Sequence, residues 1–184
     1  MACVITITSG SSPHVLKCVV SIPPLASVLE DIGGASVSVY ILINKGQNPH
    51  TFEPTPGQIK ALISSDILFT VGLPFETAFL SHFQGPKKKF TLCDTSAGSI
   101  LIKKNPRNKE EKNGFGEENH HIWLSPKNLT SIAQIINMSL KTADPSRAKS
   151  YHARTMLFIK KLDNVHRKNI ELLSPLQGKS FSVL

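Results

Sequence analysis

Apolar residues in the first hundred positions form short runs that alternate with segments of helical periodicity. Residues 15–22 are rich in Val and end at prolines, which is typical of a buried strand. The other extended runs are 36–43, 66–71 and 88–93, with a short extended piece near 99–102. Helical segments at 25–32, 58–63 and 74–83 separate them. This alternation predicts an α/β fold with a mostly parallel four-stranded sheet flanked by helices.

In the second part of the chain, the sequence pattern predicts only helices. An amphipathic pattern covers 126–140, after the polar segment 105–119, which we expect to be a mobile surface loop. A much longer pattern runs from near Asp144 to near Leu173, where Ser174-Pro175 closes it. Thirty helical residues would span roughly 45 Å, more than the width of a small domain. We expect this helix to expose an apolar stripe formed by Phe158, Leu162 and Val165.

Two histidines stand in distinctive local sequences. His50 lies in the segment 46–56, where Pro49, Pro54 and Pro56 each fix their own φ and favour extended geometry before them. This segment follows the predicted second strand, and parallel sheets gather ligands beyond the carboxyl ends of their strands. His121 precedes Trp123, a large packing surface, and the pair Ser125-Pro126, which predicts an N-cap and a first-turn proline.

Neutral imidazoles are good ligands for zinc and, less strongly, for manganese. His50 and His121 are therefore the candidate metal ligands, although a bound divalent metal usually takes about four. Each has another interpretation, since His50 could cap its loop and His121 could pack on Trp123. Glu53 could accept a hydrogen bond from the second ring nitrogen of His50, or stabilise the loop. His120 is an auxiliary candidate whose side chain we expect to point away from that of His121.

The order of these segments resembles the family of extracytoplasmic zinc- and manganese-binding receptors of bacterial ABC transporters. The matching motifs are Ser21-Ile22-Pro23-Pro24-Leu25, Ile32-Gly33-Gly34, residues 46–56, Ser64-Ser65-Asp66-Ile67-Leu68 and residues 119–126. The resemblance runs from about Val15 to the last residue. Asn119-His120 stands where the family has Asp-Pro.

The resemblance implies a substrate-binding component that takes up zinc or manganese and delivers it to a membrane permease. Residues 15–143 would be its N-terminal metal-binding lobe, 144–174 the long linking helix and 175–184 the start of a truncated second lobe. Residues 1–14 would be an export-signal remnant. The other two metal ligands of the family would lie beyond Leu184, so binding by the two imidazoles alone should be weak. We expect a monomer in a periplasmic or other extracytoplasmic location, with Cys3 as a candidate lipid anchor.

Composition and charge argue against several other classes of protein. The 184 residues carry a formal charge of +8 and are 40% apolar, with no apolar run long enough to span a membrane. Basic residues concentrate in 145–184, but they are not interleaved with aromatic residues and no nucleic-acid motif occurs. We interpret them as a solvated helix face. Cys18 and Cys93 lie in apolar runs and should be buried, too scattered for a disulfide framework.

Two alternatives to a receptor differ in class. A two-histidine metallohydrolase would need a carboxylate ligand at a strand end and a water-activating acid, and neither is visible, so we expect no enzyme. A non-transport interaction module, or a degenerate relic of a receptor, would have little metal affinity. Equilibrium dialysis with the metal separates the receptor from this last class.

Overall fold

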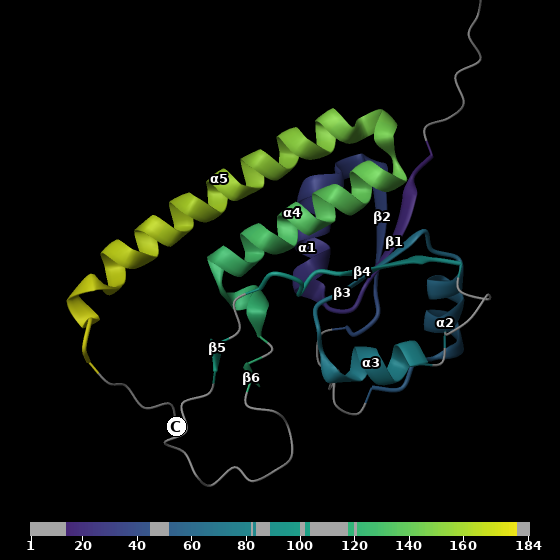
Figure 1. Cartoon of the computed structure of the whole chain (residues 1–184), viewed down its shortest axis with the longest axis horizontal. Helices are drawn as coiled ribbons and strands as arrows, with labels where there is room; N and C mark the ends of the chain where they lie inside the picture. The colour runs from purple at the N-terminus through teal and green to yellow at the C-terminus, as the bar shows by residue number, and fades with distance from the viewer. Residues whose placement is uncertain are drawn as a thin grey trace, which may run out of the picture.

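The computed structural model describes residues 14–44, 52–81, 83, 89–99, 102–103, 118–119 and 121–179. Its elements, in chain order, are β1 (Leu16–Val20), α1 (Pro23–Gly33), η1 (Gly34–Ser36), β2 (Val37–Ile41), α2 (Pro56–Ile63), β3 (Ile67–Thr70), α3 (Pro74–Ser81), β4 (Thr91–Asp94), β5 (Ile102–Lys103), β6 (Glu118–Asn119), η3 (Ile122–Leu124), α4 (Pro126–Ala143), η4 (Pro145–Arg147), α5 (Ala148–Leu173) and η5 (Ser174–Leu176). Figure 1 shows helices on both faces of one sheet, with α5 extending beyond it. None of the helices in these ranges is long and apolar enough to span a membrane.

The main sheet has four parallel strands in the order β2-β1-β3-β4. In its register, Val20 of β1 lies opposite Ile41 of β2 and Phe69 of β3. The predicted α/β fold with a four-stranded parallel sheet is therefore confirmed. The observed strands are shorter than the apolar runs, because the flanking residues belong to the loops at either edge.

Side chains of the central strands alternate between two cores. Cys18, Val20 and Phe69 belong to the larger core, together with buried residues of α1, α4 and the first turns of α5. Val19 and Leu68 point to the opposite face and join a smaller core that also contains side chains of α2 and α3. Because both faces are covered, the strands appear in the sequence as continuous apolar runs. Burial also raises the pKa of the Cys18 thiol to about 12, which agrees with its predicted role as a buried apolar side chain.

The predicted helix boundaries have clear local causes. Thr55 and Gln58 form a reciprocal capping box at the start of α2, and the Ser125 hydroxyl accepts a bond from the Asn128 N–H at the start of α4, at 3.5 Å. Gly34 follows α1 with φ +55°, a conformation that favours glycine. A Cβ atom there would lie 2.2 Å from a guanidinium nitrogen of Arg154, so α5 packs closely over this turn.

The long helix begins later than predicted, at Ala148, after the single turn η4. Asp144 precedes a proline, which disfavours helical geometry, and its backbone is at φ −138° and ψ 81°. The 26 residues of α5 are unbroken and span roughly 39 Å. The predicted exposed stripe is correct for Val165, which is 50% exposed, and wrong for Phe158, which packs against the larger core.

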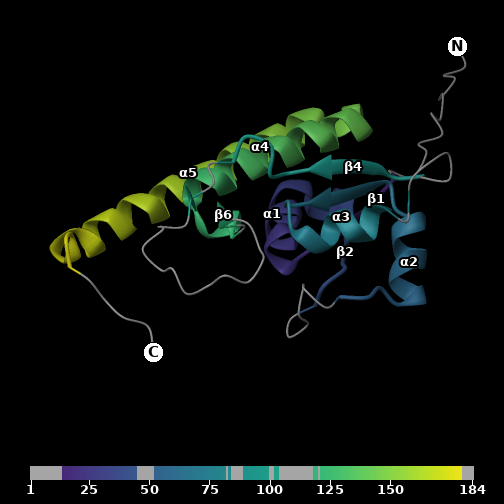
Figure 2. The same ribbon diagram turned by 60° about the horizontal axis from the view of Figure 1, so that its bottom comes forward.

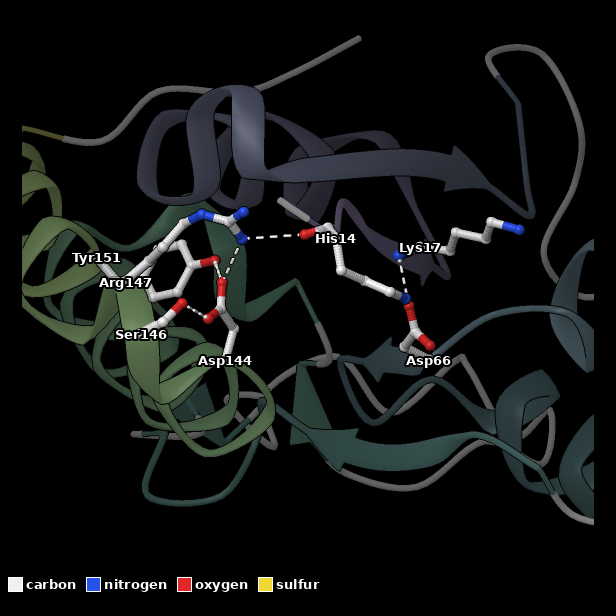
Figure 3. A network of polar contacts seen from close by, with 7 residues as sticks. All are labelled: His14, Lys17, Asp66, Asp144, Ser146, Arg147 and Tyr151. Carbon is white, nitrogen blue, oxygen red and sulfur yellow. Dashed lines mark hydrogen bonds and ion pairs between the residues drawn. The ribbon is translucent and has the colours of Figure 1, made fainter. Parts of the chain in front are cut away.

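A polar network fastens the start of α5 to the amino edge of the sheet (Figure 3). The Tyr151 hydroxyl donates to the Asp144 carboxylate at 2.9 Å, and Arg147 pairs with the same carboxylate. Arg147 also donates to the carbonyl of His14, just before β1, at 3.0 Å. Nearby, Asp66 accepts a bond from the Lys17 N–H at 2.8 Å, so it has a structural role just before β3.

An extended piece was predicted near 99–102, where β5 begins, but its pairing with β6 was not predicted. Lys103 and Glu118 are register partners in an antiparallel pairing of β5 with β6. Glu118 and Asn119 thus form a strand where the sequence predicted only a surface loop, because the pairing depends on a partner fifteen residues away. The rest of that loop, 105–117, lies outside the described residues.

Candidate metal centre

The carboxyl ends of all four parallel strands meet at one edge of the sheet. The turn 71–73 follows β3 at this edge, and the segment that contains His50 follows β2. Figures 1 and 2 show the short turn before α4 on the side toward which β4 points. This turn begins at His121. We therefore consider the candidate ligands in relation to the carboxyl edge of the sheet.

His50 and His120 lie outside the described residues. The predicted approach of the His50 and His121 imidazoles to a single metal ion therefore stays a prediction. So does the predicted orientation of His120 away from His121. Within the described ranges, no three His, Cys, Asp or Glu side chains gather into a group that could hold a metal ion.

His121 is exposed at the start of η3. Its carbonyl accepts a bond from the Leu124 N–H at 3.1 Å, and its ring lies 5.1 Å from the ring of Trp123, tilted by 57°. Ile122 is buried in the larger core and Trp123 packs against that core. Both interpretations of His121 remain open, because a ring in contact with Trp123 can still bind a metal through a nitrogen atom.

The described residues on both sides of the segment 45–51 are anchored. On the entry side, the Leu42 and Ile43 N–H groups donate to the carbonyls of Val20 and Ser21 at 2.9 and 3.0 Å. The carbonyl of Leu42 in turn accepts a bond from the Gln58 side chain at 2.7 Å. On the exit side, the ring of Phe52 lies against two rings of α3. The chain therefore enters and leaves this segment from fixed points at the carboxyl edge.

Glu53 is exposed between Phe52 and Thr55, the N-cap residue of α2. Its predicted hydrogen bond to His50 involves a residue outside the described part of the chain and stays a prediction. The capping box of α2 fixes the backbone two residues further on, with the Thr55 N–H donating to the Gln58 side chain at 2.7 Å. Glu53 is thus on a short segment between two anchored positions.

The carboxylate of Glu76 organises the turn that follows β3. It accepts bonds from three successive backbone N–H groups, those of Val71 at 3.0 Å, Gly72 at 2.8 Å and Leu73 at 2.9 Å. Glu76 is only 4% exposed, although it carries a charge when ionised. Its side chain therefore serves as the internal acceptor of a turn at the carboxyl edge.

Burial raises the pKa of Glu76 above its ordinary value, because a buried carboxylate loses its hydration. Contact with the Ser21 hydroxyl and the three backbone N–H groups opposes this effect and is smaller. This residue was not predicted from the sequence. The available signal is Pro74 at the first position of α3 with an acidic residue at the third, where a side chain can reach back to free N–H groups.

A comparison with family models matches residues 18–183 to the family described as ZnuA, zinc-uptake complex component A, periplasmic. Among solved structures, the fold is similar to a zinc-bound ZnuA deletion mutant, with a TM-score of 0.77 and 30% identity over 88% of this chain and 60% of that one. A second crystal structure of ZnuA gives the same TM-score and identity.

Curated proteins with similar sequences also carry the names of metal-binding components. The chain is 27% identical over 175 residues to the manganese ABC transporter substrate-binding lipoprotein PsaA of Streptococcus mitis, covering 92% of this chain and 55% of that protein. It is 26% identical over 182 residues to the zinc-binding protein AdcA of Streptococcus pyogenes serotype M1, covering 90% of this chain and 35% of that protein. The chain therefore spans about half, or less, of the length of these relatives.

Proposed function

The chain belongs to the ZnuA family of periplasmic zinc-uptake components, and we propose that it forms the metal-binding lobe of a substrate-binding component of an ABC transporter. Its cargo would be zinc or manganese, the metals that the names of its relatives carry. His50 and His121 would supply the imidazole ligands. Binding, and not catalysis, is the proposed activity.

One observation supports this proposal most directly, namely the position of His121. The residue is exposed at the carboxyl side of the sheet, while the next two residues anchor its turn to the larger core. A ligand is best held by an exposed side chain on a fixed backbone, and His121 has both properties. The segment with His50 follows β2 in the sequence, and we propose that both histidines lie on the same side of the lobe.

We also propose the organisation and the surroundings of the whole protein. Residues 15–143 would be the lobe, 144–174 the linking helix and 175–184 the start of further structure, with a membrane permease as the partner. The location would be periplasmic or otherwise extracytoplasmic, and the protein would be a monomer. Glu53 and His120 would lie next to the metal without being among its principal ligands.

The test is metal binding by the purified chain, measured by competition between the protein and a chromophoric zinc chelator. The wild type should bind one zinc ion per chain. His50→Ala and His121→Ala should each weaken binding at least tenfold, because each removes one of the two imidazoles. His152→Ala is the matched control, since His152 is exposed on α5 and is not placed at the carboxyl edge.

The proposal also predicts the pH dependence of binding. A histidine binds a metal in its neutral form, so binding releases protons from protonated imidazoles and weakens as the solution becomes acidic. Zinc binding that survives both the His50→Ala and the His121→Ala substitution would refute the assignment of the ligands. A folded wild-type chain that binds no zinc, even weakly, would instead favour a non-transport module.

A further inference from the structure

An array of phenylalanine rings begins directly after the segment 45–51 and crosses the smaller core. The ring of Phe52 lies 5.5 Å from Phe75 at 71° and 6.4 Å from Phe79 at 68°. Phe79 continues the array to Phe83 at 5.1 Å, and Phe83 continues it to Phe90 at 6.1 Å. The two contacts of Phe52 and the contact between Phe83 and Phe90 are edge-to-face, a geometry that depends on ring position as well as on burial.

Phe52 occupies the point where the two cores meet. Phe52 itself packs against the smaller core, whereas its partner Phe75 packs against the larger one. Both partners belong to α3, whose first turn is held by the buried carboxylate of Glu76. The ring of Phe52 is thus clamped against a helix whose start is itself fixed.

This clamp has a direct connection to the proposed ligand. His50 is two residues before Phe52, a separation of at most about 7 Å along the chain. The entry side of the segment is fixed by backbone bonds to β1, as described above. The ring of Phe52 is therefore the side-chain anchor nearest to His50 on the exit side, among the described residues.

We propose that Phe52 is a positioning residue for metal binding: docking of its ring on Phe75 and Phe79 fixes the backbone at residue 52, two residues after the proposed ligand. This inference rests on the proposed function. It assigns metal affinity partly to an aromatic contact that touches no metal. A site is sensitive to such a contact because its ligands must be held within about half an ångström of the productive geometry.

The experiment compares variants at the two ends of the same array. Phe52→Ala and Phe83→Ala each remove a half-buried ring that packs against the smaller core. Zinc affinity is measured by chelator competition, and stability by the midpoint of urea unfolding. We expect both variants to unfold at lower urea, but only Phe52→Ala to lose about tenfold in zinc affinity. Phe83→Ala should stay within twofold of the wild type.

Two further variants separate ring geometry from burial. Phe52→Tyr keeps the ring and should retain wild-type affinity, whereas Phe52→Leu keeps an apolar side chain without the edge-to-face contacts and should lose affinity. If Phe52→Ala does not fold, the zinc affinity of Phe52→Leu is compared with that of Phe83→Ala instead. Wild-type affinity in Phe52→Leu, or an equal loss in Phe83→Ala, would overturn the inference.

The His50→Ala variant distinguishes a failure of the positioning role of Phe52 from a failure of the ligand assignment. Loss of binding in His50→Ala together with unchanged binding in Phe52→Leu refutes the role of Phe52 and leaves the proposed function standing. Unchanged binding in His50→Ala refutes the ligand assignment and the positioning role with it. A folded wild-type chain that binds no zinc overturns both.

Discussion

Removing the carboxylate of Glu76 should be among the most destabilising changes at the carboxyl edge. In Glu76→Ala, the N–H groups of Val71 and Leu73 lose their acceptor, and these residues are only 1% and 8% exposed. Each buried donor left unpaired costs about 1–3 kcal/mol. The Gly72 N–H belongs to an exposed residue, so water can replace its bond. Relief of the buried charge offsets part of the loss, and we expect a net decrease of about 3 kcal/mol in the free energy of unfolding.

The assay is urea unfolding at pH 7, followed by far-ultraviolet circular dichroism. Glu30→Ala is the matched control, because Glu30 is an exposed carboxylate on α1 of the same lobe. Exposed substitutions of this kind usually change stability by no more than about 0.5 kcal/mol. A loss below about 1 kcal/mol in Glu76→Ala, or one equal to that of the control, would show that the turn 71–73 finds other acceptors.

The raised pKa of Glu76 adds a pH dependence of known sign. The folded protein takes up a proton at this carboxyl at higher pH than the unfolded chain, whose ordinary value is 4.5. The stability of the wild type relative to Glu76→Gln should therefore rise as the pH falls through the raised folded pKa, and become constant below about 4.5. Urea midpoints of both proteins at several pH values measure this difference. A relative stability that falls on acidification would mean that the backbone bonds outweigh burial.

Two further substitutions test the anchors of the helices. Tyr151→Phe keeps the buried ring but removes the hydroxyl that donates to Asp144, and we expect a loss of about 1 kcal/mol in unfolding free energy by urea titration; an unchanged midpoint would mean that Ser146 and Arg147 satisfy the carboxylate without the hydroxyl. Ser125→Ala removes the acceptor of the Asn128 N–H, and because that bond is long, at 3.5 Å, we expect a loss near the lower end of the capping range, about 0.5 kcal/mol. A gain in stability, measured in the same titration, would contradict the assigned cap.

The fold could be predicted because each element carries its own local signal. β1 and β3 are covered on both faces and therefore appear as continuous apolar runs, and Pro23, Pro56 and Pro126 mark the starts of three helices. The β5–β6 pairing gave no such signal, since its strands are only two residues long and each depends on a partner distant in the sequence. The start of α5 was misplaced because Asp144 looks like an N-cap, whereas its side chain bonds to Ser146, Arg147 and Tyr151.

The candidate site could be predicted in part for a similar reason. Ser125-Pro126 and Trp123 are local signals, and they correctly located the exposed His121 before a capped helix. Glu76 and the contacts of Phe52 depend on residues that lie far apart in the sequence or on a turn that no motif marks. Such contacts decide how rigidly a ligand is held, while the sequence motif predicts only which residue is the ligand.

Different contacts stabilise the two edges of the sheet. At the amino edge, the network of Asp144, Arg147 and Tyr151 bonds α5 to the chain just before β1. Further along α5, Lys161 pairs with Asp31 of α1 at 3.2 Å, so the helix is held at two separate points as it passes the lobe. At the carboxyl edge, Glu76 and Phe52 hold the turns next to the candidate ligands. Because the same four strands connect both edges, the network at the start of α5 and the turn fixed by Glu76 are joined through one sheet.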